Sequence, residues 1–405
     1  MTIFVTDSDR TRTVRPFQEI LARASEGEAL TPDDGYRLIR ASATELPELL
    51  LAASRLRDRG KGQIVTYSRK VFIPLTNLCR DKCGYCTFAK APNHPEAHTM
   101  TPDEVLAVAR AGQAQGCKEA LFSLGEKPED LHQRARDDLR RLGYPSTVAY
   151  LAAMCDLVYR ETGLLPHANC GVLTREDFAQ LREVNASMGL MLENVSERLL
   201  QRGQAHYGCP GKAPALRLET IETAGELGIA FTTGILIGIG ETLEERVDSL
   251  FAIRDLQARS GNVQEVIIQN FRVKLDIRMR DHREPSPLDM LRTLAVARLI
   301  LGPDQNVQAP PNLAPDVYQM YLYAGINDWG GISPVTKDHI NPERAWPMIQ
   351  EMYATTAEAG FTLRERLCLY SEYIAQPAFV RERFRARIAS LVDERGIVRQ
   401  EETRC

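Results

Sequence analysis

The stretch PLTNLCRDKCGYCTF, residues 74–88, places Cys79, Cys83 and Cys86 within eight residues of one another. The other six of the nine cysteines are scattered along the rest of the chain. An odd number of cysteines in a chain with no export signal argues against a disulfide framework and for free thiols, apart from any that bind a metal. The three clustered thiols therefore point to metal chemistry, and the segments around them must show which kind.

From this stretch onward, short apolar or β-branched runs alternate with longer amphipathic stretches. The runs are continuously hydrophobic, which is typical of parallel strands buried on both faces. The stretches between them carry helix start signals, such as TPDE at 101–104 and TLEE at 242–245. Because no GxGxxG follows the first run, the pattern predicts an α/β fold of the (β/α) TIM-type barrel class, complete or partial, rather than an open sheet. The expected strands cover residues 71–77, 119–125, 164–169, 187–194, 230–238 and 265–271, with two further runs at 306–312 and 325–331.

We expect one catalytic domain with an extension at each end. The barrel is predicted to span residues 61–375, with the cysteine loop directly after its first strand, at the face where such barrels carry their active sites. Residues 1–60 are predicted to form an N-terminal helical extension, in which two helices cap the barrel. Residues 376–405 are predicted to form a C-terminal helical tail, and the pattern is helical and charged from about residue 341.

Composition excludes several classes of protein. With 44% hydrophobic and 26% charged residues, the chain resembles an average soluble globular protein. The net charge is -4 and no dense Lys/Arg block occurs, so we expect no nucleic-acid partner. No apolar run reaches the roughly 18 residues of a membrane helix, so we expect no membrane partner. The first residues carry no secretory signal pattern, which makes the cytoplasm the expected compartment.

Two metal centres suit the spacing C-x3-C-x2-C. A structural zinc takes four closed ligands, and His94 or His98 could supply the one that the cysteines do not. An iron-sulfur cube is the alternative, because thiolates are good ligands for iron-sulfur clusters as well as for zinc. The spacing of the cysteines leaves both possibilities open.

Two other segments place glycines at expected strand ends. SLGEKPE (123–129) combines a small residue, a glycine and an acid, which lets polar groups of a ligand approach the backbone. GILIGIGE (234–241) has three glycines on one buried strand, which suggests that a flat group lies against that backbone. Each segment alone is also compatible with an ordinary tight turn.

Taken together, these segments resemble the radical S-adenosylmethionine (SAM) superfamily. The resemblance implies that Cys79, Cys83 and Cys86 hold a 4Fe-4S cluster whose fourth iron is left for SAM. The reduced cluster would cleave SAM to a 5'-deoxyadenosyl radical. The residues that the resemblance assigns to SAM are Tyr85, Gly125, Glu126, Glu193, Gly234, Leu236 and Gly238.

Within the superfamily, LFSLGEKPE (121–129), TTGILIGIGET (232–242) and NDWGGISPVT (327–336) are similar to the CofG family. CofG proteins are the 7,8-didemethyl-8-hydroxy-5-deazariboflavin (FO) synthase subunits of deazaflavin coenzyme biosynthesis. The resemblance covers residues 65–375 and implies a radical SAM carbon-nitrogen lyase. The implied substrate is the product of the partner CofH, 5-amino-5-(4-hydroxybenzyl)-6-(D-ribitylimino)-5,6-dihydrouracil, and the implied electron donor is a one-electron reductant such as ferredoxin or flavodoxin.

That substrate requires hydrogen-bond partners for its uracil and ribityl groups and a pocket for its phenol. Polar residues at or near the expected carboxyl ends of strands are the candidates. His167 is the expected proton carrier, because the pKa of an imidazole lies nearest neutrality. The candidates are His167, Asn169, Gln269, Asn270, Asn327 and Asp328.

Two rival hypotheses remain. A sister radical SAM enzyme, either CofH-like or a menaquinone-pathway cyclase, would use the same cluster on another aromatic substrate. A zinc-stabilised binding module without catalysis would use the three cysteines and a histidine only to hold a loop.

Overall fold

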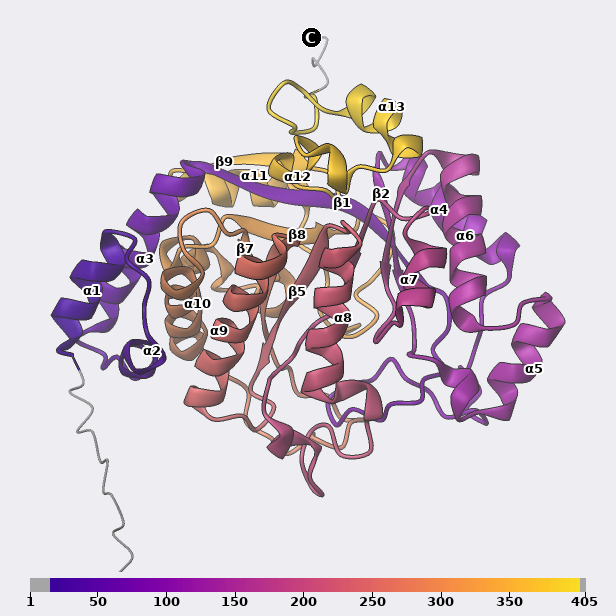
Figure 1. The fold of residues 1–405 in the computed structure, drawn as a ribbon, viewed down its shortest axis with the longest axis horizontal. Coiled ribbons are helices and arrows are strands. Elements are labelled where there is room, and N and C mark those ends of the chain that lie inside the picture. The colour runs from indigo at the N-terminus through magenta and orange to yellow at the C-terminus, as the bar shows by residue number, and fades with distance from the viewer. Residues whose placement is uncertain (1–14, 401–405) are drawn as a thin grey trace, which may run out of the picture.

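Eight parallel strands close into a barrel in the computed structural model, which describes residues 15–400. Strands β2 to β8 pair in sequence order, and β1 closes the ring by pairing with both β8 and β2 (Figure 1). The predicted (β/α) TIM-type barrel is therefore confirmed, and it is complete. The strands are β1 (Ile64–Pro74), β2 (Glu119–Ser123), β3 (Leu165–Asn169), β4 (Ser187–Gly189), β5 (Phe231–Ile237), β6 (Val263–Asn270), β7 (Val307–Gln308) and β8 (Asp328–Ile332).

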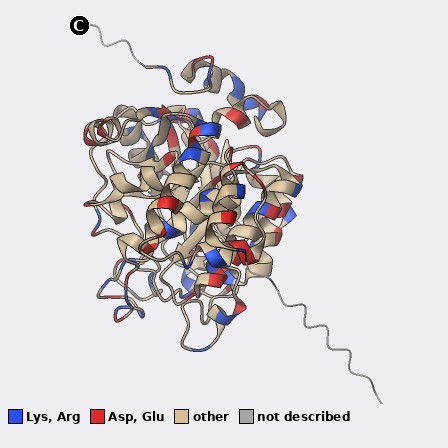
Figure 2. Ribbon diagram, turned by 90° about the vertical axis from the view of Figure 1, so that its left-hand side faces the viewer, with Lys and Arg blue, Asp and Glu red and all other residues tan. Residues whose placement is uncertain are grey.

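Helices surround the barrel and are started by the expected signals. Thr101 accepts a hydrogen bond from the backbone of Glu104, and Thr242 does the same for Glu245, so both predicted capping boxes are confirmed. No helix among residues 15–400 is long and apolar enough to cross a membrane. Figure 2 shows acidic and basic positions interspersed along the outer helices of the face in view. The α-helices between β1 and β7 are α4 (Pro102–Ala114), α5 (Gln133–Leu142), α6 (Thr147–Thr162), α7 (Arg175–Leu181), α8 (Pro214–Glu226), α9 (Leu243–Ser260) and α10 (Pro287–Leu301).

Three helices precede the barrel, where two were expected. They are α1 (Phe17–Ser25), α2 (Pro32–Leu38) and α3 (Leu46–Lys61). The prediction of two helices was wrong because the chain is interrupted after α2. Ser42 and Glu45 hydrogen-bond each other there, and Pro47 lies in the first turn of the separate helix α3. Helix α3 packs beside α10 on the outside of the barrel, and α2 contacts α9 (Figure 1).

The segment after residue 341 contains a strand that the helical pattern concealed. Strand β9 (Thr362–Arg366) pairs with the first half of β1 in parallel, with Ile64 opposite Thr362. It is flanked by α11 (Ile349–Glu358), α12 (Ser371–Ile374) and α13 (Glu382–Leu391), which gather near one end of the barrel (Figure 1). The domain boundaries at residues 60 and 375 stay predictions, and their parts at 1–14 and 401–405 lie outside the described residues.

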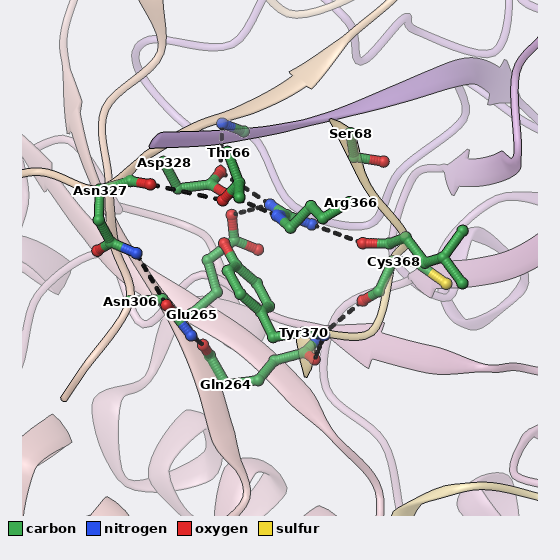
Figure 3. A network of polar contacts seen from close by, with 12 residues as sticks. Thr66, Ser68, Gln264, Glu265, Asn306, Asn327, Asp328, Arg366, Cys368 and Tyr370 are labelled. Carbon is green, nitrogen blue, oxygen red and sulfur yellow. Dashed lines mark hydrogen bonds and ion pairs between the residues drawn. The ribbon is translucent and has the colours of Figure 1, made fainter. Parts of the chain in front are cut away.

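The chain that follows β9 forms the floor of the barrel at the amino ends of the strands. Arg366 donates to Asp328, with 2.6 Å between Nε and Oδ2, and to Glu265, with 2.9 Å between Nη2 and Oε1. The carbonyl of Cys368 accepts from Ser187 of β4 and from the side chain of Gln264 on β6. We call the ion network of Arg366, Asp328 and Glu265 the floor network; Figure 3 shows Arg366 at its centre.

Candidate active site

A cavity of about 240 Å³ at the carboxyl ends of the strands, here called the upper cavity, gathers most of the predicted site residues. Its wall combines the cysteine loop after β1 with the loops after β2, β3, β4 and β6. The carboxyl face is where barrels of this class place their chemistry. The predicted residues that line it are Cys79, Cys83, Tyr85, Cys86, Gly125, Glu126, Asn169, Glu193, Leu236, Gln269 and Asn270.

The three thiols share this wall and are free cysteines. The sulfur of Cys79 accepts backbone hydrogen bonds from Asp81 at 3.3 Å and from Glu126 at 3.2 Å. Burial raises the pKa of the Cys79 thiol to about 12 and also raises the pKa of Cys86. Because a soft metal centre needs thiolates, loading it would release protons from these buried groups.

A fourth cysteine stands beside the trio. A hydrogen bond from Cys209 lowers the pKa of Cys83, and the loop that carries Cys209 is tied to the cysteine loop by the amide of Gly84, 2.7 Å from the carbonyl oxygen of Ala205. Among residues 15–400, no three His, Cys, Asp or Glu side chains are grouped closely enough to hold a single metal ion. The set that does face one hollow is the three thiols, with two backbone amides on the sulfur of Cys79, and this donor set fits an iron-sulfur cluster.

Charged side chains line the same cavity as the thiols. Lys212 lies 2.6 Å from Glu193, measured from Nζ to Oε1, and Arg217 lies 3.6 Å from Glu126, measured from Nη2 to Oε2. Burial pushes the pKa of Glu193 up, but Lys212 and Arg217 outweigh it and bring that pKa below its usual value. The wall can therefore offer both signs of charge to a zwitterionic ligand. Sequence reasoning missed Lys212 and Arg217, because their loop and helix start carry no motif.

Glu193 has a backbone φ of 64°, in the left-handed region that non-glycine residues rarely adopt. Its amide donates to the carbonyl of Gly234, and its own carbonyl accepts from Leu236, so β5 holds it in place. This conformation stores strain at a residue that lines the upper cavity, a combination that marks functional sites.

The predicted glycines serve close approaches between segments of the chain. A Cβ on Gly125 would stand 1.8 Å from the carbonyl oxygen of Leu78, so only glycine lets the two loops meet. A Cβ on Gly234 would stand 2.2 Å from the carbonyl oxygen of Ile267. Gly238 has a φ of 90° and faces Pro285. Gly234 and Gly238 do not line the upper cavity, and their contact with SAM stays a prediction.

A second cavity of about 190 Å³, here called the lower cavity, occupies the barrel interior. Asn169, Gln269 and Asn341 line both cavities, so the two hollows adjoin at a shared set of side chains. His167 lines only the lower one. A ligand in the lower cavity would thus lie next to one in the upper cavity.

The tautomer of His167 follows from its neighbours. Its Nδ1 lies 2.7 Å from the hydroxyl oxygen of Ser187, which donates its single proton to the carbonyl of Cys368. Nδ1 must therefore be the donor, which leaves Nε2 as an acceptor. Burial lowers the pKa of His167 to about 4, so the ring is neutral at pH 7 and can take up a proton rather than give one.

Asn327 and Asp328 were expected at the carboxyl end of a strand, and this placement was wrong. Asp328 is the first residue of β8 and belongs to the floor network, at the opposite end of the barrel. Asn327 is bound to Arg298 and Asn306. The run 325–331 straddles the start of the strand because the pairing with β1 begins at Asp328.

The histidines considered as zinc ligands lie apart from the upper cavity. His98 pairs with Glu104, 3.0 Å away, and lines a different hollow of about 1030 Å³. The Nδ1 of His94 accepts from the amide of Glu96. Neither histidine lines the cavity that the three thiols share.

Comparison with known proteins gives the family. Residues 73–253 match the radical SAM superfamily. Over 311 residues the chain is 52% identical to the 7,8-didemethyl-8-hydroxy-5-deazariboflavin synthase of Methanopyrus kandleri, covering 77% of this chain and 93% of that protein. The chain belongs to the deazariboflavin synthase family of radical SAM proteins. Membership of this superfamily implies a 4Fe-4S cluster and SAM.

Longer members of the deazariboflavin synthase family are also similar. The chain is 47% identical over 401 residues to the FO synthase of Streptomyces coelicolor and 46% identical over 393 residues to that of Mycobacterium tuberculosis. These alignments cover 96% and 93% of this chain but 46% of each relative. The chain thus spans about half the length of the FO synthases that it matches.

Solved structures share the fold of this family member. The maturase HydG of Carboxydothermus hydrogenoformans superposes with a TM-score of 0.71 at 18% identity, over 89% of this chain and 84% of that chain. Methylornithine synthase (PylB) superposes with a TM-score of 0.66 at 21% identity, over 85% and 97% of the two chains. At such identities the likeness concerns the barrel fold alone.

Proposed function

We propose that this chain is the CofG-type half of FO synthesis, a radical SAM carbon-nitrogen lyase. It would convert the CofH product 5-amino-5-(4-hydroxybenzyl)-6-(D-ribitylimino)-5,6-dihydrouracil into FO, with loss of ammonia. The observation that carries the proposal is the 52% identity across 93% of a deazariboflavin synthase. The adjoining upper and lower cavities support it, because they provide space for a cofactor beside a substrate.

Cys79, Cys83 and Cys86 would hold the 4Fe-4S cluster, since all three face the upper cavity. When bound, the reduced cluster and SAM supply a 5'-deoxyadenosyl radical. The backbone amides on Cys79 would stabilise its thiolate. A one-electron reductant such as ferredoxin or flavodoxin would provide the electron.

The charged wall would orient SAM. Lys212 and Arg217 are the cations suited to the carboxylate of its methionine part, and Glu193 is suited to its amino or ribose groups. Tyr85 and Leu236 offer apolar surface for the adenine. Burial of these groups excludes water, which strengthens each electrostatic contact.

The substrate would occupy the lower cavity. Asn169 and Gln269 lie at the junction of the two cavities, where amide groups can bond the edges of a uracil ring. His167 would accept a proton at Nε2, the only nitrogen of its ring that Ser187 leaves free. CofH would supply the substrate as the functional partner.

One experiment tests this function. The protein is reconstituted anaerobically with iron and sulfide, reduced, and given SAM with or without the CofH product. Deazaflavin fluorescence that grows together with 5'-deoxyadenosine and ammonia, only when the CofH product is present, would support the proposal. Turnover of tyrosine with 5-amino-6-(D-ribitylamino)uracil would indicate a CofH-like enzyme instead. A colourless, zinc-loaded and inert protein would eliminate both.

A further inference from the structure

The side chains that line the lower cavity differ in polarity between its deep end, here called the floor of the cavity, and the end next to the upper cavity. Five different strands direct polar side chains into its deep end. Successive inward residues of a strand lie two apart, so the next inward residues form a separate layer above them. The floor layer consists of Lys70, His167, Thr232, Glu265 and Gln308.

Several groups of this floor retain hydrogen-bonding capacity. Lys70 uses one donor on Glu119, 2.8 Å away, and an ammonium has three. His167 presents its bare Nε2. The side-chain amide of Gln308 bonds no other residue of the described chain, although it is buried and lines the cavity. The floor therefore offers a cationic donor, a neutral acceptor and an amide that can do both.

The layer above the floor is largely apolar and aromatic. Phe72 and Trp346 stack with ring centroids 5.3 Å apart and planes 3° apart, and both line the cavity. Leu121 and Ile267 add aliphatic surface. Nearer the upper cavity the amides return, and the buried Oδ1 of Asn312 has no partner within residues 15–400.

We propose that this gradient fixes the orientation of the substrate, with its polyhydroxylated chain on the floor of the lower cavity. This inference rests on the proposed function. A ribityl chain both donates and accepts at every hydroxyl, and it bends to reach partners on separate strands. The phenol would lie against Phe72 and Trp346, and the uracil edges would meet the amides near the upper cavity.

The opposite orientation leaves the floor unsatisfied. A phenol at the floor has one hydroxyl, so most of the free groups of Lys70, His167 and Gln308 would lose water without gaining a partner. Buried polar groups without partners are costly, which makes this orientation unfavourable. Gln308 is thus assigned as a specificity residue for the polyol chain.

The test uses two stable ligands that differ only in that chain. FO and its 10-methyl counterpart, which lacks the hydroxyls, are titrated by fluorescence into the anaerobically reconstituted protein. We expect the wild type to bind FO at least tenfold more tightly than the 10-methyl compound. Gln308→Leu should weaken FO binding about tenfold, the effect of one or two hydrogen bonds, and leave the 10-methyl compound unchanged.

A second test variant and a control variant check this interpretation. Lys70→Gln should weaken FO selectively as well, while Gln133→Leu on the exposed face of α5 should alter neither ligand. Thermal unfolding checks that each variant is folded. Equal weakening of both ligands by Gln308→Leu, or no effect on either, would overturn the orientation. Formation of FO by the wild type is measured separately, so failure of the proposed function is seen independently of the binding result.

Discussion

The upper cavity and the floor network both bury charged or ionisable groups, but they commit them differently. In the floor network, Arg366 of β9 bonds both Asp328 and Glu265 (Figure 3). In the upper cavity, the three thiols face a hollow. The difference teaches that burial of charge does not itself mark a functional site. The three thiols line a hollow, whereas the charges of the floor network are bonded to one another.

The two regions should therefore respond differently to substitution. Removing one partner of a buried ion pair strands the other, which costs stability. Shortening a side chain that faces a hollow leaves the packing of the protein nearly as it was. We expect the floor network to govern stability and the upper cavity to govern activity.

The largest effect is expected at Cys83. Cys83→Ala should reduce 5'-deoxyadenosine formation more than about a thousandfold, because catalysis depends on the chemistry of a metal centre that Cys83 would ligate. The unfolding free energy of the metal-free protein should change by less than about 1 kcal/mol. Reconstituted activity and chemical denaturation measure the two. Cys117→Ala, at a buried cysteine away from the upper cavity, serves as the control and should retain turnover. Near-normal activity of Cys83→Ala would refute its role.

The reverse pattern is expected at Arg366. Arg366→Met should lower the unfolding free energy by about 3–5 kcal/mol, because Asp328 and Glu265 would remain buried without their cation. Denaturant titration of the metal-free protein provides the measurement. Adding Asp328→Asn to this variant should recover part of the loss. A variant as stable as the wild type would show that the floor network does not stabilise the barrel.

The burial of His167 predicts that the free energy of unfolding depends on pH. Its pKa is about 4 in the folded protein and near 6.5 when exposed, so between these values the unfolded chain binds more protons. Stability contributed by the neutral ring is thus present above pH 6.5 and is lost as the pH falls, by about 3 kcal/mol at pH 4. Comparing wild type with His167→Gln across this range isolates the contribution. Parallel pH profiles would contradict the burial of a neutral imidazole.

The smallest of these effects is expected at Lys212. Lys212→Met should weaken SAM binding by about 2 kcal/mol, roughly thirtyfold, because the charge-assisted hydrogen bond proposed between its ammonium and the carboxylate of SAM would be lost. Lys212→Arg keeps the charge and should lose less. Equilibrium dialysis with the reconstituted protein measures the affinity, and Lys82→Met, in the cysteine loop but not in the cavity lining, is the matched control. Unchanged affinity in Lys212→Met would remove this residue from the SAM site.

The sequence allowed the barrel and the cysteine loop to be predicted because both depend on local pattern. Parallel strands buried on both faces produce continuous apolar runs, and the TPDE and TLEE boxes start helices without outside help. Strand β9 was missed because its buried residues include Arg366, which is tolerated there only through ion pairs from distant strands. No local pattern records such pairing.

Parts of the candidate site were beyond sequence reasoning for a related reason. Asp328 carries the residue type of a catalytic group, but the pairing of β8 with β1 puts it at the wrong end of the barrel. Lys212 and Arg217 belong to a connection and a helix start that only the closed barrel brings to the thiols. Residue type was readable from the chain, whereas the end of the barrel at which a residue stands depended on tertiary register.

The most direct test of the central claim is electron paramagnetic resonance of the reduced, reconstituted protein with and without SAM. If Cys79, Cys83 and Cys86 are the protein ligands, as proposed, one iron is left open, so we expect a 4Fe-4S signal that changes when SAM is added, in the wild type and equally in Cys209→Ala. A signal that SAM does not alter in the wild type would mean that the cluster is already fully ligated by protein. If Cys209→Ala then restored the response, Cys209 beside Cys83 would be the fourth ligand, and the assignment of an open iron would be wrong.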